Sequence, residues 1–124
     1  MRTKTGNKKL GDLSEKLAAK FLKRRGYEIL TKKYRGAGGE IDIVAKEKGS
    51  LVFVEVRSKS GSEFGLPYET INYEKRKRLE KTAVEFQKRF KLIDRDSRFD
   101  CVSVLFDKNF KVVEIDLIKD AFWS

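Results

Sequence analysis

The sequence predicts an α/β fold, a mixed central β-sheet flanked by helices, from the length of the chain and the order of its periodic segments. At 124 residues the chain is long enough for one compact domain, residues 1–124, and too short for two. Its apolar residues recur with helical or strand periodicity in the order helix, three strands, helix and two strands. This order is typical of a layered α/β domain. Hydrophobic and charged residues make up 40% and 39% of the chain, so the charge should surround an ordered core.

The first helix is expected from Asp12 to about Arg25. Asp12 offers an N-cap and Glu15 follows three residues later, which is the arrangement of a capping box. Residues 1–9 are basic and polar, and we expect them to form a flexible basic arm. The apolar face of this helix is marked by Leu13, Leu17, Ala18, Phe21 and Leu22.

Five strands are expected from segments rich in β-branched and aromatic residues. The second and third are separated by the turn Lys48-Gly49, which predicts an antiparallel hairpin. Residues 35–39 are expected to form a flexible connection and residues 60–70 a loop, and the spacing of apolar residues predicts a second helix over 71–90. The predicted strands cover residues 27–34, 40–47, 51–58, 98–107 and 111–118.

The composition excludes several kinds of active site. The chain contains no histidine, which excludes His-based zinc sites, hydrolases with a histidine base and histidine-dependent nucleases. Any chemistry must therefore use carboxylates, lysines or a metal held by oxygen. Twenty-nine Lys and Arg against nineteen Asp and Glu give a net charge of +10, which makes nucleic acid the first partner to consider; a merely basic soluble protein is the alternative.

The location of the protein is predicted from what the sequence lacks. The N-terminal residues MRTKTGNKK are not followed by the apolar core of a signal peptide, and no run approaches the ~20 apolar residues of a membrane span. The single cysteine, Cys101, excludes an intramolecular disulfide. We expect a cytoplasmic protein without a membrane partner.

Three acids interrupt the strands of the predicted hairpin, at Glu40, Asp42 and Glu55. If Lys48-Gly49 is a two-residue turn, Asp42 lies directly opposite Glu55 on the same face of the sheet. Opposed side chains have Cβ atoms ~4.5 to 5.5 Å apart, where two carboxylates repel each other. A divalent cation would remove this conflict, and ligands that are all oxygens suit Mg²⁺ or Mn²⁺.

The acids also have a purely structural explanation. In the same register Glu40 lies opposite Arg57 and could pair with it, while Asp42 and Glu55 could be neutralised by nearby lysines. Two features favour the metal site over this structural explanation. The strands are hydrophobic enough to be central, and opposed acids do not stabilise a hairpin. Strand alternation places three apolar residues together on the other face, namely Ile41, Ile43 and Ala45.

The motif GEID, followed about a dozen residues later by VEVR, resembles the D…(D/E)-x-K signature of the restriction-endonuclease-like nuclease superfamily. Together with GGEIDIVA, LVFVEVRSKS and the triplet RFD, it resembles the YraN-like bacterial family, which is similar to Holliday-junction resolvases. The resemblance covers residues 11 to about 117. It implies a restriction-endonuclease-like three-layer fold.

The resemblance also implies roles for individual residues. Asp42 and Glu55 would be metal ligands, and Glu15 would be the additional acid that resolvase-like members contribute from the first helix. For Glu15 the capping interaction stays open as an alternative. Arg57 stands where the superfamily has lysine, and arginine cannot accept a proton at ordinary pH. Hydrolysis would then use metal-bound water, with Arg57 or Lys59 stabilising the developing charge.

A basic segment, YEKRKR at residues 73–78, opens the second predicted helix. Its cations could follow a nucleic-acid backbone through phosphate contacts, which give affinity with little sequence preference. An exposed basic face without a ligand is the alternative. The candidate nucleic-acid-binding residues are Arg35, Lys75, Arg76 and Arg78.

Three functions remain compatible with the sequence. The leading prediction is an endonuclease that uses Mg²⁺ or Mn²⁺ to hydrolyse structured or branched DNA, and a homodimer would suit a symmetric junction. The first alternative is a non-catalytic nucleic-acid-binding module that retains a nuclease fold, in which Arg57 marks lost chemistry. The second is an interaction protein whose basic surface binds an acidic protein.

Overall fold

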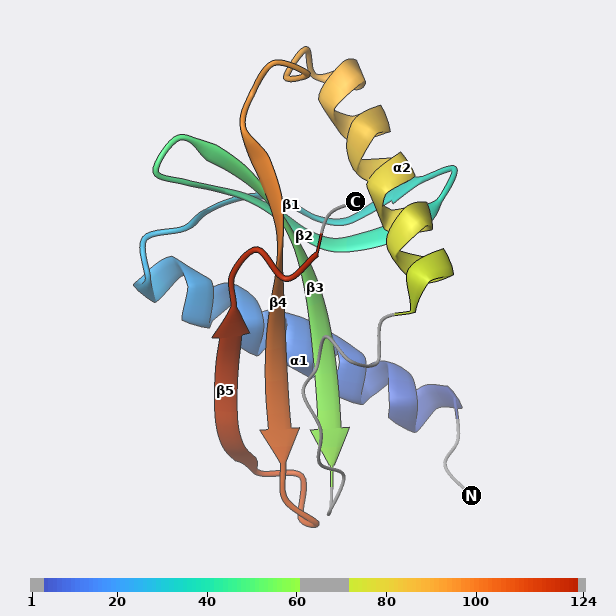
Figure 1. Ribbon diagram of the computed structural model, residues 1–124. Coiled ribbons are helices and arrows are strands. Elements are labelled where there is room, and N and C mark those ends of the chain that lie inside the picture. Colours follow the sequence, from blue (N-terminus) through green and yellow to red (C-terminus); the bar gives the residue numbers. More distant parts are fainter. Residues whose placement is uncertain (1–3, 61–71, 123–124) are drawn as a thin grey trace.

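The fold is a three-layer α/β sandwich, in which one helix covers each face of a five-stranded sheet (Figure 1). The computed structural model describes residues 4–60 and 72–122. The helices are α1 (Lys4–Arg24) and α2 (Tyr73–Arg89). The strands, which have the same order in the sheet as in the chain, are β1 (Glu28–Gly36), β2 (Gly39–Glu47), β3 (Ser50–Ser60), β4 (Ser97–Phe106) and β5 (Val112–Ile118).

The sheet is mixed because one of its strand pairs is parallel. Strands β3 and β4 run parallel, whereas β1–β2, β2–β3 and β4–β5 are antiparallel. A parallel pair needs a crossover connection, and α2 lies in the segment that makes it. The predicted α/β class, element order and three layers are confirmed, and each strand end lies within two residues of its predicted position.

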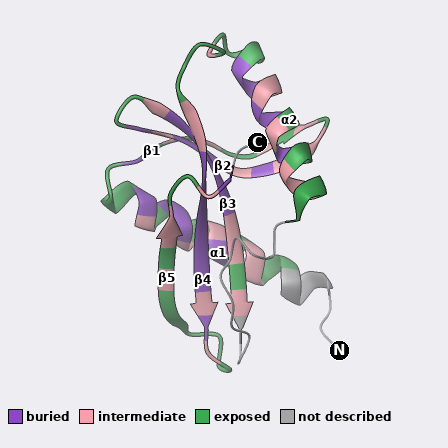
Figure 2. Ribbon diagram, viewed as in Figure 1, coloured by how far each residue is buried: buried purple, intermediate pink, exposed green. Residues whose placement is uncertain are grey.

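Buried residues are concentrated in β2, β4 and the first half of β3 (Figure 2), and they divide between two cores, one on each face of the sheet. On one face Leu22 of α1 packs in a cluster with Val54 of β3. On the other face Phe86 of α2 meets Phe53 of β3 edge to face, with ring centroids 5.9 Å apart. Because neighbouring residues of β3 point into two different cores, this strand lies in the middle of the sheet, as its continuous apolar run predicts.

Helix α1 begins well before the predicted start at Asp12. Its first residue is Lys4, so residues 4–9 are helical and their assignment to a flexible arm is wrong; residues 1–3 lie outside the described residues. The hydroxyl of Ser14 donates to the carbonyl oxygen of Leu10 at 2.9 Å, a bond typical of a helix interior. Leu10 packs against the α1-side core, and this contact extends the helix toward the N-terminus despite the glycine at position 11.

The early start of α1 also removes the capping interpretation. Asp12 lies inside the helix, and its carboxylate accepts a hydrogen bond from Lys33 of β1 at 2.6 Å. Glu15 is likewise an interior residue, so it does not serve the end of the helix. The alternative role for Glu15 as part of a capping box is therefore wrong.

The connection between β1 and β2 is a tight turn that packs against α2, not the predicted flexible connection. The backbone N–H of Gly38 donates to the hydroxyl of Thr82 at 3.0 Å, and the N–H of Ala37 donates to Glu85 at 2.9 Å. A Cβ at Gly38 would run into the carbonyl oxygen of Arg78. Glycine is needed here because the backbone of the turn touches the backbone of the helix.

A buried carboxylate, Asp100 of β4, joins distant parts of the chain. It is fully buried and accepts hydrogen bonds from the Tyr27 hydroxyl at 2.7 Å and from Arg98 Nε at 2.9 Å. Arg98 also donates to Glu47 at 2.7 Å. Since an unpaired buried charge is strongly unfavourable, these contacts explain how polar residues are accommodated between apolar strands.

Helix α2 is confirmed where the sequence places it, with its N-cap at Asn72. The predicted loop over 60–70 falls almost wholly outside the described residues, as does residue 71. In the part of the chain that is described, neither helix has both the length and the apolar character needed to cross a membrane.

Candidate metal centre and its basic surroundings

The hairpin of β2 and β3 has the predicted register near its turn and becomes irregular at its far end. Glu47 pairs with Ser50, and the pairing continues as far as Ile43 and Val54. Beyond that point the alternation of β2 is interrupted, because Ile41 packs in the α2-side core although Ile43 packs in the α1-side core. The predicted placement of Ile41 on the same face as Ile43 and Ala45 is therefore wrong. Asp42 lies at this interruption.

The irregularity brings together acids from a helix and a strand. Glu15 of α1 and Glu40 and Asp42 of β2 each offer an oxygen, and these oxygens lie within 4.8 Å of one another. Glu40, which the resemblance does not name as a metal ligand, thus has an oxygen within the same distance. Its own carboxylate pairs with Arg35 of β1 at 3.1 Å and not with Arg57 as the structural explanation supposed.

Glu55 of β3 completes the group through Asp42. One Asp42 oxygen accepts a hydrogen bond from the backbone N–H of Val56 at 2.7 Å, which fixes the carboxyl beside β3. Burial, the charge of Glu55 and a hydrogen bond with the Glu55 side chain raise the pKa of Asp42 to about 9. Burial also raises the pKa of Glu15. We define these four residues, Glu15, Glu40, Asp42 and Glu55, as the acidic cluster.

The acidic cluster fits a hard divalent cation. One carboxylate oxygen of Glu15 is buried and has no hydrogen-bond partner among the described residues. All the ligand atoms on offer are carboxylate oxygens, the donor type that Mg²⁺ and Mn²⁺ prefer. Carboxylates gathered in a partly buried place repel each other, and a doubly charged ion would stabilise their ionised forms.

Among the described residues, two cations lie against the Glu55 end of the acidic cluster. Lys75 Nζ in the first turn of α2 lies 2.6 Å from Glu55 Oε2, and Arg57 Nη1 lies 3.6 Å from the same oxygen. Lys75 is therefore the closer of the two counter-ions, and it covers Glu55 from the α2 side. Glu55 itself is only 5% exposed. The pairing of Glu55 with a lysine was part of the structural explanation, and it is observed.

The remaining predicted site residues take several positions around the acidic cluster. Arg57 and Lys59 lie on β3, where they pair in register with Ser103 and Leu105 of β4. Lys59 is four residues from Glu55, which places it about 13 Å further along the strand. Arg78 is exposed on α2 above the β1–β2 turn, and Arg76 is half-buried. The structure therefore brings Lys75 and Arg57 to the acids and leaves Lys59 further along β3.

Two contacts of the site had little signal in the sequence. Lys75 is twenty residues from Glu55, and only the packing of α2 brings them together. Glu40 and Arg35 are paired residues of β1 and β2, directly opposite each other beside the turn. A tight turn at Gly36–Gly39 would have predicted this pair, but the glycines were interpreted as a flexible connection.

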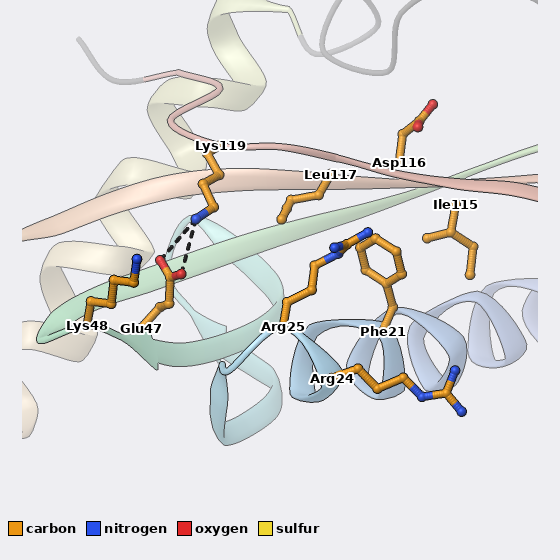
Figure 3. Close-up of a pocket in the computed structure, with 9 residues that line it drawn as sticks. All are labelled: Phe21, Arg24, Arg25, Glu47, Lys48, Ile115, Asp116, Leu117 and Lys119. Atoms are coloured by element: carbon orange, nitrogen blue, oxygen red, sulfur yellow. Dashed lines mark hydrogen bonds and ion pairs between the residues drawn. The ribbon is translucent and has the colours of Figure 1, made fainter.

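A separate hollow of about 690 Å³ lies between the end of α1, β5 and the β2–β3 turn (Figure 3). The guanidinium of Arg25 lies over the ring of Phe21, 4.1 Å from its centroid, and Lys119 binds Glu47 at 3.1 Å. The described residues that line the hollow include none of the predicted site residues. They are Phe21, Arg24, Arg25, Glu47, Lys48, Ile115, Asp116, Leu117 and Lys119.

Known proteins resemble this chain over nearly its whole length. Residues 14–104 match the family described as "Uncharacterised protein family UPF0102", and this range includes the acidic cluster and Lys75. A UPF0102 protein of Caldicellulosiruptor saccharolyticus is 42% identical over 115 residues, which cover 93% of this chain and 98% of the relative. One of Clostridium kluyveri is 40% identical over 116 residues, which cover 94% and 95%. One of Moorella thermoacetica is 41% identical over 112 residues, which cover 90% and 93%. The family resemblance seen in the sequence is confirmed, and the chain belongs to the UPF0102 family.

Proposed function

We propose that the protein is a metal-dependent endonuclease that hydrolyses phosphodiester bonds in structured or branched DNA. The observation that carries this proposal is the acidic cluster itself. Carboxylates from α1, β2 and β3 meet there, the pKa of Asp42 is raised to about 9, and an oxygen of Glu15 is buried without a partner. Strongly perturbed acids that gather in one place are typical of functional sites.

In this proposal, residues of the acidic cluster hold the metal and neighbouring groups position the ligands and the phosphate. Asp42 and Glu55 would be the principal ligands, with Glu15 as a further ligand, and the N–H of Val56 keeps the Asp42 carboxyl in place. When bound, Mg²⁺ or Mn²⁺ supplies a Lewis acid for the phosphate and lowers the pKa of its own water. Arg57 stays charged at any ordinary pH, so its part would be to hold phosphate oxygens and not to accept a proton.

The surroundings of the acidic cluster favour a polyanionic substrate. The protein carries a net charge of +10, and Arg35, Arg57 and Lys75 lie beside acids of this site. Arg35 is 77% exposed beside Glu40, and Arg78 is exposed on α2. Cations placed in this way would contact phosphates on either side of the scissile bond, and such contacts carry little sequence information. We therefore expect the protein to recognise the shape of its DNA substrate and not the base sequence.

The test is cleavage of a labelled four-way junction, a single strand and a plain duplex, each with Mg²⁺, with Mn²⁺ and with EDTA. We expect metal-dependent cutting that Asp42→Asn reduces by at least about 10³-fold, because the amide keeps the shape of the side chain and loses its charge. Glu28→Gln, which alters an exposed acid on β1, is the matched control and should cut like the wild type. Equal cutting by the wild type and Asp42→Asn would reject the assigned centre.

A second candidate function is a nucleic-acid-binding module without catalysis. It is favoured by Arg57, which occupies the strand position of the superfamily's lysine. This candidate predicts salt-sensitive DNA binding that is the same with and without metal, and no cutting of any of the three substrates. Metal-dependent cutting that disappears in Glu55→Gln would exclude it.

A further inference from the structure

We propose that Lys75 is exchanged for the metal ion at Glu55, and that its released ammonium group then contacts the phosphate of the substrate. This inference rests on the proposed metal-dependent function and adds a residue to it. It assigns to α2 the lysine that β3 lacks at position 57, and it makes one side chain in the first turn of α2 respond to metal binding.

The exchange is argued from the Glu55 carboxylate, which Lys75 contacts and which the proposed function assigns to the metal. Lys75 Nζ lies 2.6 Å from Glu55 Oε2, and Glu55 is nearly fully buried. A Mg²⁺ or Mn²⁺ ligand must lie about 2.0 to 2.1 Å from the ion, so a metal on Glu55 and an ammonium on the same oxygen would repel each other at close range. Lys75 therefore occupies part of the space around Glu55 that a bound cation would require.

The backbone at Lys75 stays in place while its side chain moves. The N–H of Lys75 donates to the Asn72 side chain at 2.8 Å, and the N–H of Arg76 donates to the Asn72 carbonyl oxygen at 3.0 Å. This cap fixes the start of α2. The four-carbon stem of lysine is flexible, so the ammonium can leave Glu55 and remain within a side chain's length of it.

The destination of the released ammonium is set by charge. A phosphodiester that approaches the metal brings non-bridging oxygens, which carry the negative charge, next to the acidic cluster. The ammonium of Lys75 loses its carboxylate partner at the same site and finds a new anion in these oxygens. Arg57, the other cation near Glu55, lies on a β-strand whose backbone is paired on the β4 side, so the two cations approach the phosphate from different elements.

The test measures metal affinity and cutting separately in the full-length protein. Mn²⁺ is titrated calorimetrically into the wild type, Lys75→Met, Lys75→Gln and Lys81→Met, a control that removes an exposed charge from the same helix. Loss of the competing ammonium should tighten Mn²⁺ binding about tenfold in both Lys75 variants. Loss of the phosphate contact should slow junction cutting at saturating Mn²⁺ by about a hundredfold. Lys81→Met should match the wild type in both measurements.

Each outcome decides one part of the inference. Unchanged or weaker Mn²⁺ binding by the Lys75 variants overturns the exchange, and tighter binding with undiminished cutting overturns the phosphate contact. A lysine that only supported the fold would not improve metal affinity when it is removed. The proposed function is judged independently by Asp42→Asn, which should lose Mn²⁺ binding. If the wild type binds no Mn²⁺, both the function and the exchange are rejected.

Discussion

The ionised form of Asp42, which a metal would require, is unfavourable for the stability of the folded protein. Its ordinary pKa of 3.8 rises to about 9 in the folded protein, first because of burial and then because of Glu55. Between these two pH values the folded protein binds a proton at Asp42 that the unfolded chain releases. The free energy of unfolding therefore falls as the pH rises from about 4 to about 9. A bound metal would reverse this effect by favouring the carboxylate.

Asp42→Asn should therefore stabilise the metal-free protein. The amide carries no charge and can still accept the hydrogen bond from the Val56 N–H, so the gain in free energy of unfolding should grow with pH and exceed about 1 kcal/mol at pH 8. Urea unfolding in EDTA at pH 5 and pH 8 measures it, with Glu28→Gln as the control. A gain that is the same at both pH values would contradict the raised pKa. The same variant should lose cutting, as expected where a site is retained at a cost in stability.

At the scale of the elements, the turn between β1 and β2 positions the site by fitting under α2. Gly38 touches the backbone of α2 at Arg78, and the turn is flanked by Arg35 and Glu40. A shift of this turn would move Glu40 away from Asp42 and displace the helix that carries Lys75. Close packing of these two elements thus links the two ends of the acidic cluster.

A pair of glycine variants tests this packing. Gly38→Ala places a methyl group against the Arg78 carbonyl and should lower the free energy of unfolding by about 2 kcal/mol. Gly11→Ala is the matched control, because nothing lies within 4 Å of the added methyl group in α1. It should raise the free energy of unfolding by about 1 kcal/mol, since alanine favours a helix interior. Chemical unfolding of both variants measures the difference. Similar values for the two would mean that the turn does not pack tightly against α2.

The elements also separate what the sequence could predict from what it could not. Local patterns were sufficient for the register of β2 and β3, because a two-residue turn at Lys48 and Gly49 determines every pair back to Ile43. The same rule failed at Ile41, where β2 leaves the alternation, and no pattern of side chains marks that position. The start of α1 was missed because Leu10 is stabilised by tertiary packing. Lys75 and Glu55 meet only after α2 has docked, so their contact had no local signal.

At the scale of the whole molecule, basic residues occur on both helical layers. Arg78 lies on α2, on the same layer as Lys75 and next to the turn that precedes Glu40. Arg24 ends α1 on the opposite layer and lines the separate hollow (Figure 3). Both arginines are exposed, so removing either one lowers the net charge of +10 by the same amount. The two positions therefore distinguish a defined binding face from a general attraction of DNA to a basic protein.

The salt dependence of DNA binding makes that distinction measurable. Each phosphate contact contributes about 0.9 to the slope of log affinity against log salt concentration. If DNA lies across the acidic cluster, Arg78→Gln should lower the slope by about 0.9, whereas Arg24→Gln should leave it unchanged. Fluorescence anisotropy with a labelled junction, measured in EDTA over a range of salt concentrations, gives the slopes without cleavage. Equal losses in the two variants would indicate binding by net charge alone. A loss confined to Arg24→Gln would place the DNA on the α1 side, away from the acidic cluster.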